Sequence, residues 1–159
     1  MLRDYCEKDA AAVSRLALAG FEEFRAAYSD WAAMSASISQ MPSLAAVGEL
    51  IVAEVDGKLI GAVAYIPPDR PKAPFFESHW PVVRMLVVHP GARSKGVGRA
   101  LMDECCRRAR RDGSPVLALH TSPIMTAALA MYCHMGFVFQ HEAPPIWGVP
   151  SAVYLLKWQ

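Results

Sequence analysis

The chain has 159 residues, of which 53% are hydrophobic, so it is long enough to bury the core of one domain of ordinary size. Its 16 basic and 15 acidic residues leave a formal charge of +1, which gives no electrostatic case for nucleic-acid binding. No apolar run approaches the ~20 residues of a membrane span, and charges come too early for a signal peptide. We therefore expect a soluble cytoplasmic protein, a single domain over residues 1–159, without a nucleic-acid or membrane partner.

The beginning of the chain is predicted to form a short strand and two helices. "LRDYC" is typical of an edge strand, and Asp9 is a suitable N-cap for the helix that follows. A second helix is expected over Asp30 to Ser39, ending near Pro42. The first helix is indicated by apolar residues at three- and four-residue spacing, namely Val13, Leu16, Ala17, Gly20, Phe21 and Phe24.

A hairpin, a loop and a buried strand are predicted next. Leu50 to Val55 and Lys58 to Ile66 are two strands joined by the turn signal Asp56-Gly57. Five prolines between Pro67 and Pro81 exclude a regular element, so that segment is expected to be a loop. The almost continuous apolar run from Val82 to His89 fits a buried central strand.

The rest of the chain is predicted to alternate between helices and strands. A helix from Gly98 to Arg111 lies between the central strand and "PVLALHT", so these two strands are expected to be parallel. Thr126 to Met135 forms a further helix, which Gly136 stops. "FVFQHE" is then a strand, Ala143 to Pro150 a Pro/Gly-rich loop, and "AVYLLKW" the closing strand. Together these elements predict a mixed sheet with helices on its faces.

Cysteines and clustered arginines suggest other chemistry only weakly. Cys6, Cys105, Cys106 and Cys133 form no C-x-x-C pair, so neither a disulfide framework nor a metal site is expected. The "RRARR" run ending at Arg111 is explained by a solvated helix face whose charges complement the C-terminal helix dipole.

The junction between the central strand and the next helix carries the clearest chemical signal. A helix begins with unpaired backbone N–H groups and partial positive charge. Gly96 and Gly98 lack the Cβ atoms that would keep a ligand from those donors, and Arg93, Lys95 and Arg99 add positive charge. The junction is therefore suited to a phosphate or diphosphate. It is neither a P-loop nor a Rossmann fingerprint, and a glycine pair that merely allows close packing is the simpler alternative for an isolated G-x-G.

Two motifs in sequence order give that junction a context. Arg93-Ser-Lys-Gly96-Val-Gly98 follows a buried strand, and Ala128-Leu-Ala-Met-Tyr132-Cys-His-Met-Gly136-Phe137 lies downstream. The pair resembles the GCN5-related N-acetyltransferase (GNAT) family from Leu50 to about Glu142. The resemblance implies an α/β (α+β) fold with a mixed, mostly antiparallel sheet of roughly six to seven strands flanked by helices. One β-α-β crossover would form the acyl-CoA site.

The resemblance implies acetyl-CoA as co-substrate and no metal. In the family the central strand splays from its parallel neighbour at a bulge, where free backbone N–H groups bind the pantetheine arm and polarise the thioester carbonyl. Leu86, Val87 and Val88 match those positions, and main-chain donors explain why the strand can be apolar. The diphosphate cradle would comprise Arg93, Ser94, Lys95, Gly96, Val97, Gly98 and Arg99.

Catalytic candidates also follow from the resemblance. Tyr132 matches the tyrosine that protonates the departing thiolate, and a core aromatic is the alternative interpretation. The glutamate that many relatives carry on the central strand is missing, which leaves the base undefined. Glu77 and His79 lie just upstream, and His120 lies near the end of the next strand. Each of these three has an ordinary loop or core role as its alternative.

The acceptor is less well defined. Arg84, within an apolar strand, needs an edge, a carboxylate such as Glu54, or an acidic group of the acceptor. Thr121 and Ser122 stand where some relatives have a CoA-binding Asn. The segments that frame the acceptor pocket in the family predict aromatic and apolar walls here, from Phe24, Tyr28, Trp31, Met34, Phe75, Phe76, Trp80 and Trp147.

These observations predict an N-acetyltransferase, an acyltransferase of class EC 2.3.1. Its reaction would be direct attack of a primary amine, carried by a small molecule, on the thioester of acetyl-CoA. The alternative is a catalytically weak acyl-CoA-binding sensor with the same fold. The resemblance also leaves a homodimer open, with contacts through the closing strands.

Overall fold

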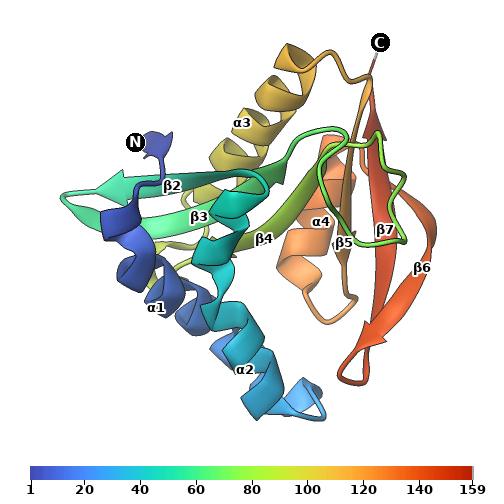
Figure 1. Ribbon diagram of the computed structural model, residues 1–159. Helices are drawn as coiled ribbons and strands as arrows, with labels where there is room; N and C mark the ends of the chain where they lie inside the picture. The colour runs from blue at the N-terminus through green and yellow to red at the C-terminus, as the bar shows by residue number, and fades with distance from the viewer. Residues whose placement is uncertain (159) are drawn as a thin grey trace.

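A single seven-stranded sheet organises the computed structural model, which describes residues 1–158. The strands lie in the order β1-β2-β3-β4-β5-β7-β6, and every neighbouring pair is antiparallel apart from β4 and β5 (Figure 1). This confirms the predicted mixed, mostly antiparallel sheet. The strands are β1 (Leu2–Asp4), β2 (Glu49–Val55), β3 (Lys58–Ile66), β4 (Val82–Val88), β5 (Val116–Thr121), β6 (Val138–Ile146) and β7 (Val149–Lys157).

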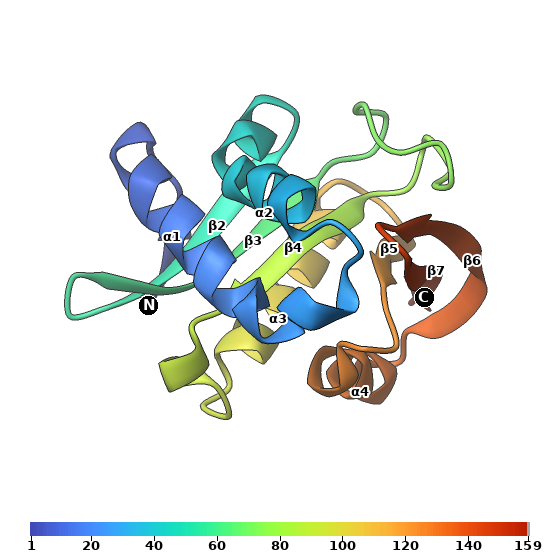
Figure 2. The same ribbon diagram turned by 90° about the horizontal axis from the view of Figure 1, so that it is seen from below.

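Helices cover both faces of the sheet. Figure 2 shows α1 (Ala10–Phe21) and α2 (Trp31–Ser39) on one side of β2 to β4, with α3 (Val97–Arg111) on the other. α4 (Thr126–Met135) contributes Tyr132 to the same core cluster as α3. Among residues 1–158, no helix combines the length and apolarity needed to cross a membrane. Short 3-10 segments lie at Glu7–Asp9, Glu22–Ala27, Met41–Ala46 and Pro90–Ala92.

The core consists of two layers because the strands point alternate side chains to opposite faces. On β4, Val82 faces the α1/α2 layer and Val83 faces the α3/α4 layer. In α3, Leu101, Cys105 and Ala109 lie four residues apart on one face of the helix and are fully buried. Within each regular stretch of strand, a residue can therefore be assigned to one side of the sheet from its position.

Local signals set most element boundaries. The Asp30 carboxylate caps α2 by accepting a hydrogen bond from the Ala33 N–H at 3.0 Å. Asp56 and Gly57 both have positive φ (52° and 78°), as a two-residue hairpin turn requires. Asp9 does precede α1, but its carboxylate does not cap that helix. It accepts instead from the Cys6 N–H and the Arg3 guanidinium, because an arginine partner is within reach.

The predicted loop over 143–150 is wrong. β6 continues through Pro144 and Pro145 to Ile146, and a two-residue turn then starts β7 at Val149. Prolines are tolerated here because β6 is an edge strand and the register with β7 shifts between Ala143 and Ile146. The turn residues Trp147 and Gly148 have φ of 40° and 82°, so they join the strands as a tight hairpin.

The parallel strands β4 and β5 separate soon after they meet. They pair only at Val82 with Ala118 and at Val83 with Leu119. Beyond that point Met85 has φ of 54°, and the register between β3 and β4 shifts opposite Val63. This is the geometry of a β-bulge, which bends the strand. Figure 1 shows β4 and β5 side by side at their starts and diverging afterwards.

Candidate active site

A cleft of about 200 Å³ occupies the space between the diverging strands. Residues from both core layers line it, so the cleft joins the two faces of the sheet. The lining residues on the α1/α2 side are Phe21, Tyr28, Met34, Ser37, Ile38, Arg84, Met85, His120, Ile146, Trp147, Val149 and Ser151. Those on the α3/α4 side are Val83, Leu86, Leu119, Thr121 and Tyr132. Ser122 and Met125 belong to the turn between β5 and α4.

The tip of the β6–β7 hairpin closes one end of the cleft. The Ser29 N–H donates to the Trp147 carbonyl at 2.8 Å, which ties this tip to the segment before α2. Of the aromatic and apolar residues predicted to wall an acceptor pocket, Tyr28, Met34 and Trp147 line the cleft. The remainder pack on the α1/α2 core layer, where Phe75 and Phe76 contact the His120 ring at centroid distances of 5.2 and 5.9 Å.

The start of α3 presents an accessible backbone. Ser94 and Gly96 both have positive φ (64° and 81°), a backbone type that turns neighbouring N–H groups to one side. A Cβ added to Gly96 would meet no protein atom within 4 Å, so the space beside this residue, at the start of the helix, is open. Gly98 faces Val88 and Met131 instead. The residues of this turn fit a diphosphate, which needs exposed donors and an open approach.

The basic side chains around this turn have distinct partners. Arg93 forms an ion pair with Glu23 and donates to the Gly20 carbonyl at 3.0 Å, which fixes the turn against the end of α1. Arg99 pairs with Asp103 along α3 at 3.0 Å. Lys95 is exposed. The positive charge expected at this junction is therefore partly held by carboxylates.

Backbone direction distinguishes among the three candidate donors on β4. The His89 N–H donates to the Ile60 carbonyl of β3 at 2.8 Å. Because N–H groups alternate along a strand, that of Val87 also faces β3, while those of Leu86 and Val88 face the side from which β5 has diverged. The N–H groups of Leu86 and Val88 are thus free of β3, and Leu86 also lines the cleft, whereas the Val87 side chain packs near Gly20.

Tyr132 reaches the cleft from α4. It is buried, and its ring packs against Phe137 at a centroid distance of 5.8 Å. Gly136, with φ of 104°, ends α4 and turns the chain so that Phe137 folds back on this ring. Burial raises the pKa of the Tyr132 hydroxyl above its usual value, so the group stays protonated and can act as a donor.

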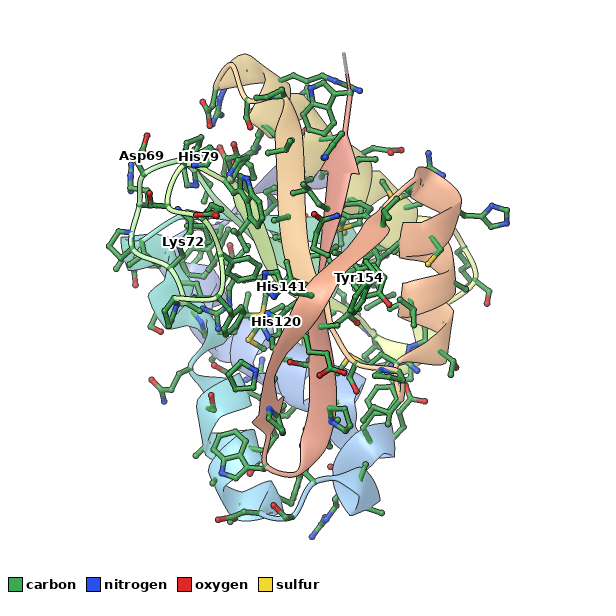
Figure 3. The ribbon with its side chains drawn as sticks, turned by 90° about the vertical axis from the view of Figure 1, so that its right-hand side faces the viewer. Asp69, Lys72, His79, His120, His141 and Tyr154 are labelled. Carbon is green, nitrogen blue, oxygen red and sulfur yellow. The ribbon has the colours of Figure 1, made fainter. Side chains whose placement is uncertain are left out.

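The three candidate bases lie in different surroundings. Glu77 and His79 are exposed on the loop between β3 and β4 and do not line the cleft. Figure 3 shows His79 at the outer part of that loop with Asp69 and Lys72, well apart from His120. His120 does line the cleft, and burial together with the nearby Arg84 charge lowers its pKa to about 4. Its ring is therefore neutral at pH 7.

Arg84 lies in the cleft without a carboxylate partner among residues 1–158. The suggested pairing with Glu54 is wrong, because Glu54 accepts from Arg3 at 2.8 Å at the far edge of the sheet. Burial alone lowers the Arg84 pKa. In Arg3, Arg108 and Arg111, by contrast, bound carboxylates raise the pKa.

Two polar side-chain atoms in the cleft have a feature that could not be predicted from the sequence. Within residues 1–158, His120 Nδ1 and Thr121 Oγ1 are buried without a hydrogen-bond partner. Thr121, the last residue of β5, is indicated in the sequence only by its match to a position where some relatives have a CoA-binding Asn. No sequence motif could show that these two atoms lack partners, because the separation of β4 and β5 depends on strands that are distant in the sequence.

The fold and the cleft together define a class of protein. Residues 11–137 match the acetyltransferase (GNAT) family, which is most of the chain. The chain belongs to this family, and the resemblance seen in its two motifs is confirmed.

Among curated proteins the chain is similar to two acetyltransferases. It is 35% identical over 86 residues to N-acetyltransferase family 8 member 3 of Rattus norvegicus, a match over 54% of this chain and 36% of that protein. It is 34% identical over 86 residues to L-2,4-diaminobutyric acid acetyltransferase of Nocardia farcinica, covering 54% of this chain and 41% of that one. The matches thus span well under half the length of either relative.

Solved structures share the fold over almost the whole chain. A GCN5-related N-acetyltransferase from Rhodopseudomonas palustris has a TM-score of 0.78 at 22% identity, covering 99% of this chain and 95% of its own. A GNAT family acetyltransferase from Brucella melitensis, solved in complex with acetyl-CoA, has a TM-score of 0.68 at 21% identity, covering 100% and 88%.

Proposed function

We propose that the chain is an acetyl-CoA-dependent N-acetyltransferase that acts on the primary amine of a small molecule. The observation that carries this proposal is the cleft between β4 and β5, which has aromatic residues in its walls and is lined from both faces of the sheet. Family membership supports acetyl transfer, and one curated relative is named for a small diamino acid. A co-substrate on one face of the sheet and an acceptor on the other would meet within this cleft.

Backbone groups would hold the co-substrate. The turn from Arg93 to Gly98 offers N–H donors and the partial positive charge of a 15-residue helix to the diphosphate. Leu86 and Val88 offer N–H groups on the open side of β4 to the pantetheine arm and the thioester carbonyl. Such preorganised donors stabilise the oxyanion that forms as the amine attacks. Arg93 would position the turn through its contacts with Glu23 and Gly20.

Two side chains would move protons. His120 is neutral at pH 7 and accepts a proton from the attacking amine, directly or through a water molecule. As the carbon–nitrogen bond forms and the carbon–sulfur bond breaks, Tyr132 gives its proton to the leaving thiolate. Glu77 and His79 would need the loop between β3 and β4 to move before either could take part. His120 is therefore the base we favour.

A turnover assay tests the function. The purified protein is incubated with acetyl-CoA and a panel of primary amines, and free thiol is measured. Acetylation of at least one small amine, identified by mass spectrometry, is expected. Micromolar binding of acetyl-CoA without transfer to any amine would instead favour the acyl-CoA sensor, and absence of binding would remove both functions.

A further inference from the structure

Among the residues that line the cleft, Arg84 is the only arginine. It follows Val83, the last residue of β4 to pair with β5. Alternation from Val82 turns it toward the α1/α2 layer, where His120 and Ser151 also face the cleft. The α3 turn proposed to hold the diphosphate lies beyond the end of β4, several residues further along the chain. Arg84 thus belongs to the acceptor side.

The cleft offers Arg84 nothing to neutralise its charge. Its lining contains no aspartate or glutamate, and its other polar side chains are hydroxyls and the neutral His120 ring. An arginine keeps its charge even when buried, and an uncompensated buried cation is costly. Arg84 is half-buried and has no such partner, whereas the buried Arg108 binds the carboxylates of Asp4, Glu49 and Glu104.

We propose that Arg84 binds a carboxylate of the acceptor, so that the substrates are small amines carrying a carboxylate and an apolar side chain. This inference rests on the proposed function. The guanidinium would bind the carboxylate on the α1/α2 side and direct the amine toward Leu86 and Tyr132 at the centre of the cleft. Tyr28, Met34 and Trp147 would contact the apolar side chain.

The same contact would assist the base. The Arg84 charge helps to lower the pKa of His120, and a bound carboxylate would offset that charge. The His120 ring would then become more basic when an acceptor occupies the cleft. The group that recognises the substrate would also prepare the proton transfer.

Matched pairs of acceptors test the proposal. Leucine, phenylalanine and 4-aminobutyrate are compared with their carboxamides, which keep the amine and side chain but lose the charge. We expect kcat/KM to favour the acids by about tenfold or more, as a charged hydrogen-bonded pair predicts. An α-carboxamide makes the neighbouring amine less basic and so more often neutral, which means amine protonation cannot cause that preference. Equal rates for acids and amides would overturn the proposal.

Variants assign the preference to the residue. In Arg84→Gln the preference for acids over amides should fall to about threefold or less, because the acids lose their charged partner. Arg84→Lys should restore part of it. Arg107→Gln, which removes an exposed arginine near the C-terminal end of α3, is the control. It should keep the wild-type ratio of kcat/KM between acids and amides. An unchanged preference in Arg84→Gln would contradict the assignment.

A binding measurement separates failure of this inference from failure of the proposed function. The protein saturated with CoA is titrated calorimetrically with N-acetylphenylalanine and with its carboxamide. Tighter binding of the acid, lost in Arg84→Gln, would support the carboxylate site even if no amine were acetylated. Equal affinity for the two compounds, or no binding of the acid, would refute it even if turnover were observed.

Discussion

Tyr132 is a buried residue that lines the cleft. Its ring packs on Phe137, and we propose that its hydroxyl reaches the reacting groups. We expect Tyr132→Phe to lower kcat about 100-fold, the smaller end of general acid effects, and to leave acetyl-CoA affinity within about twofold. Steady-state kinetics and calorimetry measure the two quantities. Full activity in a folded Tyr132→Phe protein would remove this residue from the mechanism.

His120 should also make folding sensitive to pH. Its pKa falls from 6.5 to about 4 on folding, so the unfolded chain binds more protons between these values. The free energy of unfolding is therefore unaffected by this ring above pH 6.5 and decreases as the pH falls toward 4, because protonation favours the unfolded chain. Between pH 7 and 4 the wild type should lose about 3 kcal/mol more unfolding free energy than His120→Asn.

Urea unfolding at several pH values measures that difference. The acidic residues common to both proteins cancel in the comparison. His79→Asn, which removes an exposed imidazole, is the matched control and should follow the wild-type curve. Parallel curves for wild type and His120→Asn would mean that the ring is not held neutral by its surroundings.

At the scale of elements, the turn that starts α3 can be compared with the turn that ends it. Gly96 and Gly113 have φ of 81° and 75°, and a Cβ added to either meets no atom within 4 Å. An alanine should therefore cost about 1 kcal/mol of stability at both positions. Only Gly96→Ala should weaken acetyl-CoA binding, by about tenfold, because its methyl group would project over the proposed diphosphate site. Equal acetyl-CoA affinity in the two variants would argue against that site.

Elements with strong local signals could be predicted from the sequence. The Asp56-Gly57 turn, the stop at Gly136 and the glycine-bounded start of α3 all lie where their backbone requirements placed them. The end of β6 could not be predicted, because Pro144 and Pro145 indicate a loop unless the strand is known to be at an edge. Edge position depends on the order of strands, which is a non-local property.

Predicting the site met the same limit. The α3 turn and Tyr132 are parts of motifs, so sequence spacing could find them. A candidate base could not be chosen in this way, because Glu77 and His120 are similar candidates in the sequence. The structure exposes Glu77 and places His120 in the lining of the cleft. Arg84 was recognisable as unusual, but the lack of a partner is visible only once Glu54 is seen with Arg3.

At the scale of the whole molecule, Arg108 joins α3 to the first two strands. Its guanidinium binds Asp4 of β1, Glu49 of β2 and Glu104 of its own helix at 2.7–2.8 Å. Its side chain is 10% exposed, but its partners are more accessible, so part of the pairing is screened. Arg108→Ala should lower the unfolding free energy by about 2 kcal/mol.

Arg107 provides the comparison for that experiment. It immediately precedes Arg108, its side chain is 62% exposed, and it also forms an ion pair with Glu104. Arg107→Ala should leave the unfolding free energy close to that of the wild type, because exposed ion pairs contribute little to stability. Denaturant unfolding of both variants decides the matter, and similar losses would mean that Arg108 does not act as the structural link.

The hydrogen bond from Ser29 to Trp147 has a consequence for how such proteins diversify. It joins two segments that are distant in the sequence, the segment before α2 and the tip of the β6–β7 hairpin, at one end of the cleft. Recombination that replaces only one of these segments would pair it with a partner that it does not fit. We therefore expect changes in acceptor preference to involve paired changes in these two segments, while the proposed acetyl-CoA site is unchanged.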